Sequence, residues 1–275
     1  MQLNNIAYSI AETGVELDLA KQCIEKAMQE MDRRSTAATN AGQSRWSLTR
    51  SYGFVWDTAG WIYFKMGDLP RAESYVRASW LLSPQGVVGE HLGQIYEKLG
   101  KTKEAAHVYE LAYSLMEATP QFLLTGDAGS RIQVAHQEEE ERVKAEYQSL
   151  TGKPLNIHSM DRLPNGKWPV QPSVELSEMR EAKLGPEPGP NDSAEFELKF
   201  AASAPTIATY LSGSTEMESM KNRLEGAKFK IEIPMGSKAT IYRRVTVHCS
   251  KWSPCSAVLA PMDSGPVVML PSTTN

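Results

Sequence analysis

One pattern of small and aromatic residues recurs along the first half of the chain, and it constrains the fold more than any other feature. Three segments carry it: Leu3-x2-Ile6-Ala7-x2-Ile10, Trp56-x2-Ala59-Gly60-x2-Tyr63 and Leu92-Gly93-x2-Tyr96. The last two segments lie 33 residues apart, and each is followed by a further small residue, at Ala72 and Ala105. Self-similarity at a fixed period of this size indicates an array of stacked structural units.

Each copy of the pattern predicts a pair of antiparallel helices. Gly60 and Ala72 are small, as is required where two helices approach closely. Gly67-Asp68 and Gly100-Lys101 supply the stop and start signals between paired helices. A single pair cannot bury its apolar face alone, so neighbouring pairs must stack. We expect these aromatic residues to form the core of the stack: Trp56, Tyr63, Tyr75, Trp80, Tyr96 and Tyr109.

The pattern resembles the tetratricopeptide repeat, whose helical hairpins form a solenoid. The resemblance implies a concave groove, lined by the first helix of each hairpin, that binds a peptide or protein segment. At the matching positions the groove residues are Tyr8, Phe54, Asp57, Trp61, Phe64, Lys65, Glu90, Gln94, Glu97 and Lys98. Asp57 and Trp61 stand where chaperone-binding members carry the Lys and Asn clamp for a C-terminal carboxylate. Chaperone tails are therefore disfavoured as ligands.

Two segments of the helical region lie outside the repeat register. Residues 33–51 are rich in Ser, Thr, Ala and Asn, and predict a loop or a short helix. Residues 130–150 predict a terminal capping helix, on which we expect the charge block Glu138 to Glu141 to face solvent. His136 and Glu140 have the spacing of two metal ligands, but nothing nearby completes a site. We expect no metal and no other cofactor.

A change in composition marks a boundary between two domains. Residues 151–193 are rich in proline, contain the semi-rigid spacer Gly185-Pro-Glu-Pro-Gly-Pro190, and have one helical candidate at 174–184. We therefore predict a helical domain over 1–150, a Pro-rich linker with a short helix over 151–193, a small domain over 194–260 and a flexible tail over 261–275.

Beyond the linker the hydrophobic pattern changes from helical to alternating. Strands are predicted over 195–200, 206–211, 231–233, 245–249 and 256–260. Thr215-x2-Glu218 is a capping box that predicts a helix ending near Gly226. One helix can cover one face of a small antiparallel sheet. The fold class expected for the whole chain is multidomain, with an α-hairpin solenoid followed by an α+β domain.

The order strand, strand, helix, strand, strand resembles the C-terminal domain of the TonB family, an interaction domain of the bacterial periplasm. Because members of that family bind partners by adding a strand, the resemblance implies a contact at the sheet edge. The alternative is a packing module that ends the chain. Residues 195–260 carry nine basic and six acidic residues, although the net charge of the chain is −4. This difference in sign favours weak docking between the halves, or separate partners.

Cys249 and Cys255 flank a five-residue loop and would face each other on a β-hairpin. Facing strand residues lie about 4.5 to 5.5 Å apart at Cα, which suits a disulfide. A disulfide would indicate an oxidising compartment, whereas the alternative is two reduced thiols that pack as small apolar groups. Cys23 lies on a repeat helix and is expected in the core.

No catalytic motif accompanies these features. The sequence has no G-x-S-x-G elbow, no H-E-x-x-H, no phosphate-binding loop and no G-x-G-x-x-G, and its five histidines are scattered. A net charge of −4, from 29 basic and 33 acidic residues, argues against a nucleic-acid partner. No uninterrupted stretch of about 18 apolar residues predicts a membrane span. We expect a protein that is not an enzyme and that binds a protein or peptide.

The combination of helical hairpins, a Pro-rich spacer and Arg243-Arg244 before the Cys249 strand resembles the C-terminal part of large exported bacterial proteins with a transglutaminase-like domain. The catalytic Cys, His and Asp of that domain match no residue here, so its activity is not carried over. The resemblance implies an alternative function as the accessory portion of an exported transglutaminase-like or peptidase-like enzyme. It leaves two localisations open: cytoplasmic for a complete chain, and periplasmic or otherwise extracytoplasmic for a fragment.

Overall fold

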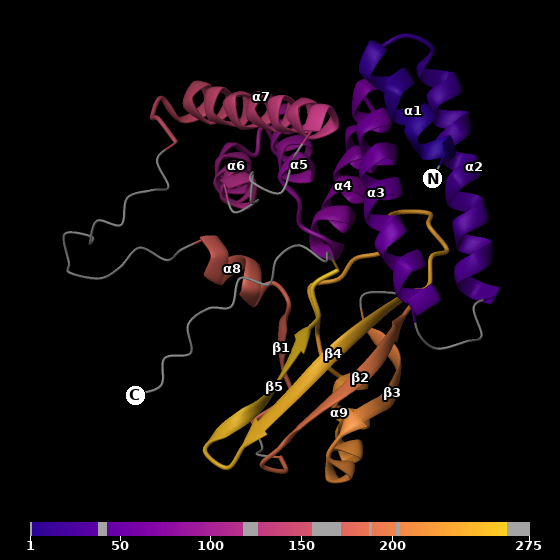
Figure 1. Cartoon of the computed structure of the whole chain (residues 1–275), viewed down its shortest axis with the longest axis vertical. Helices are drawn as coiled ribbons and strands as arrows, with labels where there is room; N and C mark the ends of the chain where they lie inside the picture. The colour runs from indigo at the N-terminus through magenta and orange to yellow at the C-terminus, as the bar shows by residue number, and fades with distance from the viewer. Residues whose placement is uncertain are drawn as a thin grey trace.

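A computed structural model describes residues 2–37, 43–117, 126–155, 172–186, 189–201 and 204–262. Its first part consists of α1 (Gln2–Thr13), α2 (Leu17–Ala37), α3 (Gln43–Lys65), α4 (Leu69–Leu82), α5 (Gly86–Lys98), α6 (Thr102–Glu117), α7 (Gly126–Thr151) and α8 (Pro172–Glu178). Its second part consists of β1 (Glu181–Lys183), β2 (Ser193–Phe200), β3 (Pro205–Gly213), η2 (Thr215–Met220), α9 (Lys221–Glu225), β4 (Ile241–Ser250) and β5 (Ser253–Leu259). The fold class is therefore α followed by α+β, as predicted, and we call the two parts the helical domain and the sheet domain (Figure 1).

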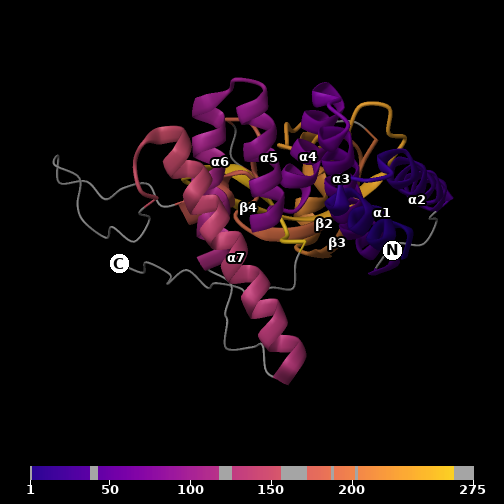
Figure 2. The ribbon, with the colours of Figure 1, turned by 90° about the horizontal axis from the view of Figure 1, so that it is seen from above.

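The helices of the first domain stack as successive hairpins. Figure 2 shows them in a row above the sheet, with α1 and α2 at one end and α6 and α7 at the other. Gly67 and Gly100 end the first helices of the second and third hairpins with φ of 80° and 71°, a conformation that glycine adopts without steric cost. The Asp68 side chain caps α4 by accepting a hydrogen bond from the Arg71 N–H at 3.3 Å. The predicted hairpin breaks are thus confirmed.

Aromatic residues fill the space between the hairpins, as predicted. Each of the expected core aromatics is at most 9% exposed: Trp56, Tyr63, Tyr75, Trp80, Tyr96 and Tyr109. Gly60 faces α4 so closely that an added Cβ would lie 2.9 Å from the Val76 nitrogen. A Cβ on Gly93 would overlap the Tyr109 ring of α6. The repeated small residues therefore set how closely the paired helices approach.

The sheet domain is a five-stranded antiparallel sheet in the order β1-β5-β4-β2-β3. Residues of β4 alternate between a buried and a solvent face, with Val245 and Val247 fully buried and Thr246 and His248 exposed. Met217 of η2 and Leu224 of α9 are also fully buried. The short helices therefore cover the apolar face of the sheet and end at Gly226, as predicted. The predicted capping box does not form, because the N-cap of η2 is Ser214, which makes no side-chain cap hydrogen bond.

Two elements predicted beyond residue 150 differ in the structure. Residues 174–184 do not form one helix: α8 ends at Glu178, and Glu181–Lys183 instead pair with β5. Residues 231–233 form no strand, because this segment turns toward the helical domain, where Glu232 forms an ion pair with Arg77 at 2.8 Å. The predicted tail lies outside the described residues from 263 onward.

The segment between the first two repeat copies joins the two domains. Residues 33–51 were expected to form a loop or short helix, but they extend α2 to Ala37 and begin α3 at Gln43. Their side chains hold the start of β4: Ser35 Oγ accepts a hydrogen bond from the N–H of Thr240, just before the strand, at 3.2 Å, and Thr49 Oγ1 accepts one from the Tyr242 N–H at 2.8 Å. The insertion therefore serves as the docking surface for the sheet domain.

Buried charged groups strengthen this interface. Arg45 of α3 pairs with Glu197 of β2 at 2.9 Å, and their side chains are 14% and 4% exposed. Arg243 of β4 is 2% exposed and donates to the carbonyl oxygens of Leu82 at 2.8 Å and Ala260 at 2.7 Å. The net charges of the two halves predicted only weak docking between the domains. They underestimated the contact, because net charge does not record specific buried interactions such as those of Arg45 and Arg243.

Candidate functional site: the concave face of the helical domain

The first helices of the three hairpins, α1, α3 and α5, bring several of the predicted groove residues together. We call the face that these helices form the concave face, after the groove that the resemblance to the tetratricopeptide repeat implies. Asp57 of α3 is buried at 7% exposure, and its Oδ1 lies 2.9 Å from Nδ1 of His91 on α5, which is 4% exposed. Tyr8 of α1 is half-buried, and its ring centroid lies 6.4 Å from that of His91. Three successive hairpins therefore converge on His91.

Trp61 lies at the centre of this group. Its ring stacks on His91 with a centroid separation of 4.0 Å and an interplanar angle of 14°, and on Phe64 at 5.1 Å. Its Nε1 donates a hydrogen bond to Glu12 Oε1 of α1 at 2.7 Å, and Lys65 Nζ lies 4.5 Å from the ring centroid. Trp61 is only 6% exposed. The indole therefore packs beneath the accessible side chains of the site and is not itself accessible to a partner.

Nearby carboxylates change the pKa values of two members of this group, His91 and Tyr8. Burial by itself lowers the pKa of His91, but the charge and hydrogen bond of Asp57, with Glu90 and Glu12, outweigh it and raise the pKa above the ordinary value. Burial raises the pKa of Tyr8, and the charge of Glu12 raises it further. The concave face can thus hold a protonated imidazole among acidic side chains.

Helix α7 completes the concave face beside α5. Glu90 is 3% exposed, and its carboxylate accepts hydrogen bonds from Arg142 Nε at 2.8 Å and Nη2 at 3.3 Å. Gln94 Nε2 donates to Glu146 Oε1 at 2.6 Å. Burial, followed by the charge of Glu90, raises the pKa of Glu146 to about 7. The capping helix therefore takes part in the site, which the sequence did not suggest.

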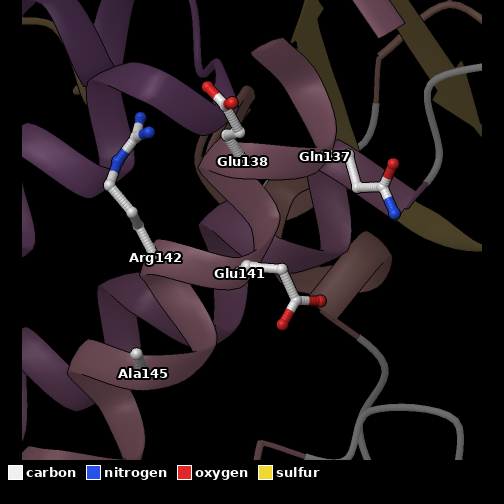
Figure 3. Close-up of a pocket in the computed structure, with 5 residues that line it drawn as sticks. All are labelled: Gln137, Glu138, Glu141, Arg142 and Ala145. Atoms are coloured by element: carbon white, nitrogen blue, oxygen red, sulfur yellow. The ribbon is translucent and has the colours of Figure 1, made fainter. Parts of the chain in front are cut away.

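The charge block on α7 does not face solvent throughout, contrary to the prediction. Glu138 and Glu141 are exposed, whereas Glu140 is 8% exposed. A shallow depression on this helix is lined by Gln137, Glu138, Glu141, Arg142 and Ala145. Figure 3 shows Arg142 and Glu141 directed to opposite sides of the helix. Arg142 reaches Glu90, and Glu141 pairs with Lys144 of the same helix at 2.9 Å.

The other predicted groove residues do not join the cluster around Trp61. Phe54 is half-buried, and Lys98 is exposed at the end of α5. Glu97 accepts a hydrogen bond from the Tyr109 hydroxyl of α6. Sequence reasoning missed four residues that contribute to the site: Glu12, His91, Arg142 and Glu146. The i, i+4 spacing of Arg142 and Glu146 was the available signal that α7 has an inward polar face.

The edge of the sheet at β3 does not leave all of its backbone N–H groups available to a partner strand. β3 is an edge strand, and the outward N–H of Ala208 donates to Glu225 Oε1 of α9 at 3.0 Å. A side chain therefore occupies part of the edge at which a partner strand would pair. The other edge strand, β1, has three residues.

Cys249 and Cys255 form a disulfide, with their Cα atoms 4.2 Å apart. Both residues are at most 1% exposed, so the bond lies inside the sheet domain next to the tip of the β4–β5 hairpin. Cys23 is a free thiol of intermediate exposure that packs at the edge of the helical core. The structure thus contains the predicted pairing.

Among the residues that the structure describes, no group of three or more His, Cys, Asp or Glu side chains is arranged to hold a metal ion. None of the helices in the described part of the chain is long and apolar enough to cross a membrane.

Comparison with protein families identifies part of the helical domain. Residues 90–118 match the tetratricopeptide repeat. The matched residues lie mainly on α5 and α6, so the match covers most of this hairpin. Neither the comparison with curated proteins nor the comparison with solved structures gave a match. The chain thus carries a tetratricopeptide repeat within a helical region, which supports a protein partner.

Proposed function

We propose that this protein is a non-enzymatic scaffold that binds a peptide or protein segment on the concave face of its helical domain. A tetratricopeptide repeat at residues 90–118 supports a protein or peptide as the partner. The observation that carries the proposal is the arrangement of accessible aromatic and cationic groups over a buried polar layer. The accessible groups are Tyr8, Phe64, Lys65 and Arg142.

The buried layer holds these groups in place before a partner arrives. The Asp57–His91 pair and the stacked Trp61 link α1, α3 and α5, and the side chains of Asp57, His91 and Trp61 are buried. A surface that is already ordered loses less conformational entropy on binding. Aromatic rings stack on apolar side chains of a partner, while Lys and Arg bind its carboxylates and backbone carbonyls. This combination suits a short segment with both apolar and acidic or polar groups.

Selection from a phage-displayed random peptide library tests the proposal. Selected peptides, labelled with a fluorophore, are titrated with the wild-type protein and with the double variant Phe64→Ser/Lys65→Ala. We expect the double variant to weaken binding at least ~10-fold, because a central aromatic anchor contributes more than about 1.4 kcal/mol. Trp61 is not substituted, because its burial would make loss of binding and loss of folding indistinguishable.

Met66 provides a matched control for this experiment. It adjoins Lys65, is 38% exposed, and is not one of the residues of the proposed site. Met66→Ser should bind the selected peptides as the wild type does. Failure of the library to yield any binder, or equal affinity for the wild type and the double variant, would contradict the proposal.

A second candidate function is favoured by the disulfide. Disulfides persist in oxidising compartments, so the bond between Cys249 and Cys255 supports an extracytoplasmic setting. In that setting the chain would serve as the accessory portion of an exported transglutaminase-like or peptidase-like enzyme. A coding sequence that continues in phase upstream of Met1, through a signal peptide and a domain bearing Cys and His, is the observation that tests this candidate.

The sheet domain has a narrower proposed role. Its order of strands around one helical segment is the basis of the resemblance to the TonB C-terminal domain. Strand addition at its edge would require displacement of Glu225 from the Ala208 N–H. We therefore assign partner binding to the helical domain first.

A further inference from the structure

Helix α7 is held on the last hairpin largely by polar contacts. Among the described side chains of α7, Val143 is the one apolar group that is fully buried. The Tyr147 hydroxyl donates a hydrogen bond to Glu110 of α6 at 2.8 Å, and Lys144 Nζ lies 5.1 Å from the centroid of the Tyr113 ring. Because polar contacts depend on charge, the docking of α7 is sensitive to the ionisation of the groups at its surface.

Glu146 lies where α7 meets α5. Its Oε1 accepts a hydrogen bond from Gln94 Nε2 of α5 at 2.6 Å. Its Oε2 is buried and accepts no hydrogen bond from any residue that the structure describes. A buried carboxylate oxygen without a donor is unfavourable, whereas a protonated carboxyl group carries no charge to be solvated. The surroundings of Oε2 therefore favour a proton on Glu146.

The Tyr109 hydroxyl of α6 supports the same conclusion. This hydroxyl donates a hydrogen bond to Glu97 of α5, and it also lies close to the carboxyl group of Glu146. A hydroxyl group has a single proton, so it can donate to one of the two carboxylates only. A proton on Glu146 allows this carboxyl group to donate to the hydroxyl oxygen, and all three groups then have partners.

The charged groups that face Glu146 oppose its ionisation. Burial has the largest effect on its pKa, followed by the charge of Glu90, and Glu97 acts in the same direction, so that the pKa rises to about 7. Tyr109 faces it from α6. Arg142, one turn earlier on α7, is a cation, but its guanidinium binds Glu90. Ionised Glu146 would therefore lie between two further carboxylates of α5.

We propose that the junction of α5, α6 and α7 is a pH-dependent switch, in which protonated Glu146 holds α7 on the last hairpin and loss of this proton to water releases α7. The side chain has a pKa of 4.5 when free and about 7 when α7 is docked. A pKa that is higher in the docked state means that docking is strongest below pH 4.5 and weakens as the pH rises to about 7.

Release of α7 also affects the concave face. Arg142 is one of the accessible groups of this face, and its position depends on α7. A partner on the concave face should therefore bind more tightly at acid pH than at neutral pH. This consequence rests on the proposed function, whereas the release of α7 does not.

Hydrogen–deuterium exchange of the free protein between about pH 5 and about pH 7.5 tests the proposal. Protection factors, corrected for the intrinsic exchange rate at each pH, are compared between residues 143–151 of α7 and residues 69–82 of α4. Relative to α4, the protection of α7 should fall at least ~10-fold over this range, because the two pKa values of Glu146 differ by more than one unit. Glu146→Gln should abolish this decrease, because an amide of the same shape has no proton to lose.

Glu141→Gln is the matched control. Glu141 lies on the same helix, its side chain is 67% exposed, and its substitution should leave the decrease as in the wild type. Glu97→Gln should move the decrease to lower pH, because it removes one negative charge that faces Glu146. Far-UV circular dichroism verifies that each variant folds.

Protection of α7 that does not depend on pH overturns the proposal. It is equally overturned by a decrease that persists in Glu146→Gln, or by loss of the decrease in Glu141→Gln. Since the measurement contains no peptide, its result is independent of whether the concave face binds one. A protein that binds peptides with an α7 that is insensitive to pH would lack the switch and retain the proposed function.

Discussion

The pKa of Glu146 is set by the packing of its side chain and not by its neighbours in sequence. The residue lies in the last third of α7, where Gln94 of α5 donates a hydrogen bond to it. Burial, and then the charge of Glu90, raises its pKa from 4.5 to about 7. His91 likewise has a raised pKa in spite of its burial, because Asp57 is in contact with it. Two side chains of the concave face, Glu146 and His91, therefore have raised pKa values.

Stability should fall as the pH rises through neutrality. A carboxyl group whose pKa is higher in the folded state binds its proton more tightly there, so its contribution is complete below pH 4.5 and is lost as the pH passes about 7. Glu146→Gln should melt at a higher temperature than the wild type at pH 8, with a smaller difference at pH 5. Thermal denaturation followed by circular dichroism from pH 5 to 9 measures this.

The control for this experiment is Glu141→Gln. Glu141 lies on the same helix with a side chain that is 67% exposed. It should leave the pH dependence of the melting temperature unchanged. A remaining decrease of stability above pH 6.5 in Glu146→Gln is assigned to His91, whose raised pKa acts in the same direction. Identical pH profiles for the wild type and Glu146→Gln would contradict the pKa assignment.

At the scale of elements, the β4–β5 hairpin is held both by the hydrogen bonds between its strands and by the Cys249–Cys255 disulfide. The register of the hairpin is irregular between His248 and Ser250, and the disulfide lies at this point. Gly189 lies against the two sulfur atoms, so closely that a Cβ there would come within 2.6 Å of both. The disulfide thus also fixes the chain segment that leads into β2.

Removal of the disulfide should destabilise the sheet domain by roughly 2 kcal/mol, because so short a loop constrains the unfolded chain only modestly. Urea denaturation of Cys249→Ser/Cys255→Ser measures the loss, and reduction of the wild type should reproduce it. Cys23→Ser serves as the control, since that thiol is free. Thiol titration of unreduced, denatured protein should detect Cys23 alone; three reactive thiols would show that the bond does not form.

At the scale of the whole molecule, the helical and sheet domains are held together by an interface rich in polar groups. Residues that interrupt the repeat register supply its helical side, through Ser35, Arg45 and Thr49. Arg243 binds one carbonyl of the helical domain, at Leu82, and one at the end of the sheet, at Ala260. Since buried polar groups of this kind are costly to leave without partners, we expect the two domains to unfold as one unit.

Arg243→Met should uncouple the two domains. The substitution keeps the length of the side chain but leaves the carbonyls of Leu82 and Ala260 without their donor, at a cost of roughly 2–4 kcal/mol. Denaturation curves from tryptophan fluorescence and from far-UV circular dichroism should coincide in the wild type and separate in the variant. Lys238→Met is the control, because Lys238 is exposed and contacts Asp32 through its backbone N–H alone. Coincident curves in Arg243→Met would argue against its coupling role.

Local patterns were sufficient for much of this structure. The spacing of Trp56, Gly60 and Tyr63 predicted which helical faces are buried, and Gly67 and Gly100 predicted where the helices end. Alternation in β4, and the cysteines that flank its turn, predicted the hairpin and its pairing. Each of these features depends on residues close in sequence, or on a period that repeats, so a single chain displays it directly.

Contacts between segments far apart in the sequence could not be predicted in this way. Nothing in the spacing of Asp57 and His91, or of Arg45 and Glu197, indicated that they would form buried pairs. The same holds for residues 33–51, whose composition predicted a loop or a short helix, although they extend two long helices and hold the sheet domain. Periodicity records that a side chain is buried but not what it is buried against. The partner is chosen when elements far apart in the chain pack together, because only then is each polar group removed from water and required to find a hydrogen bond.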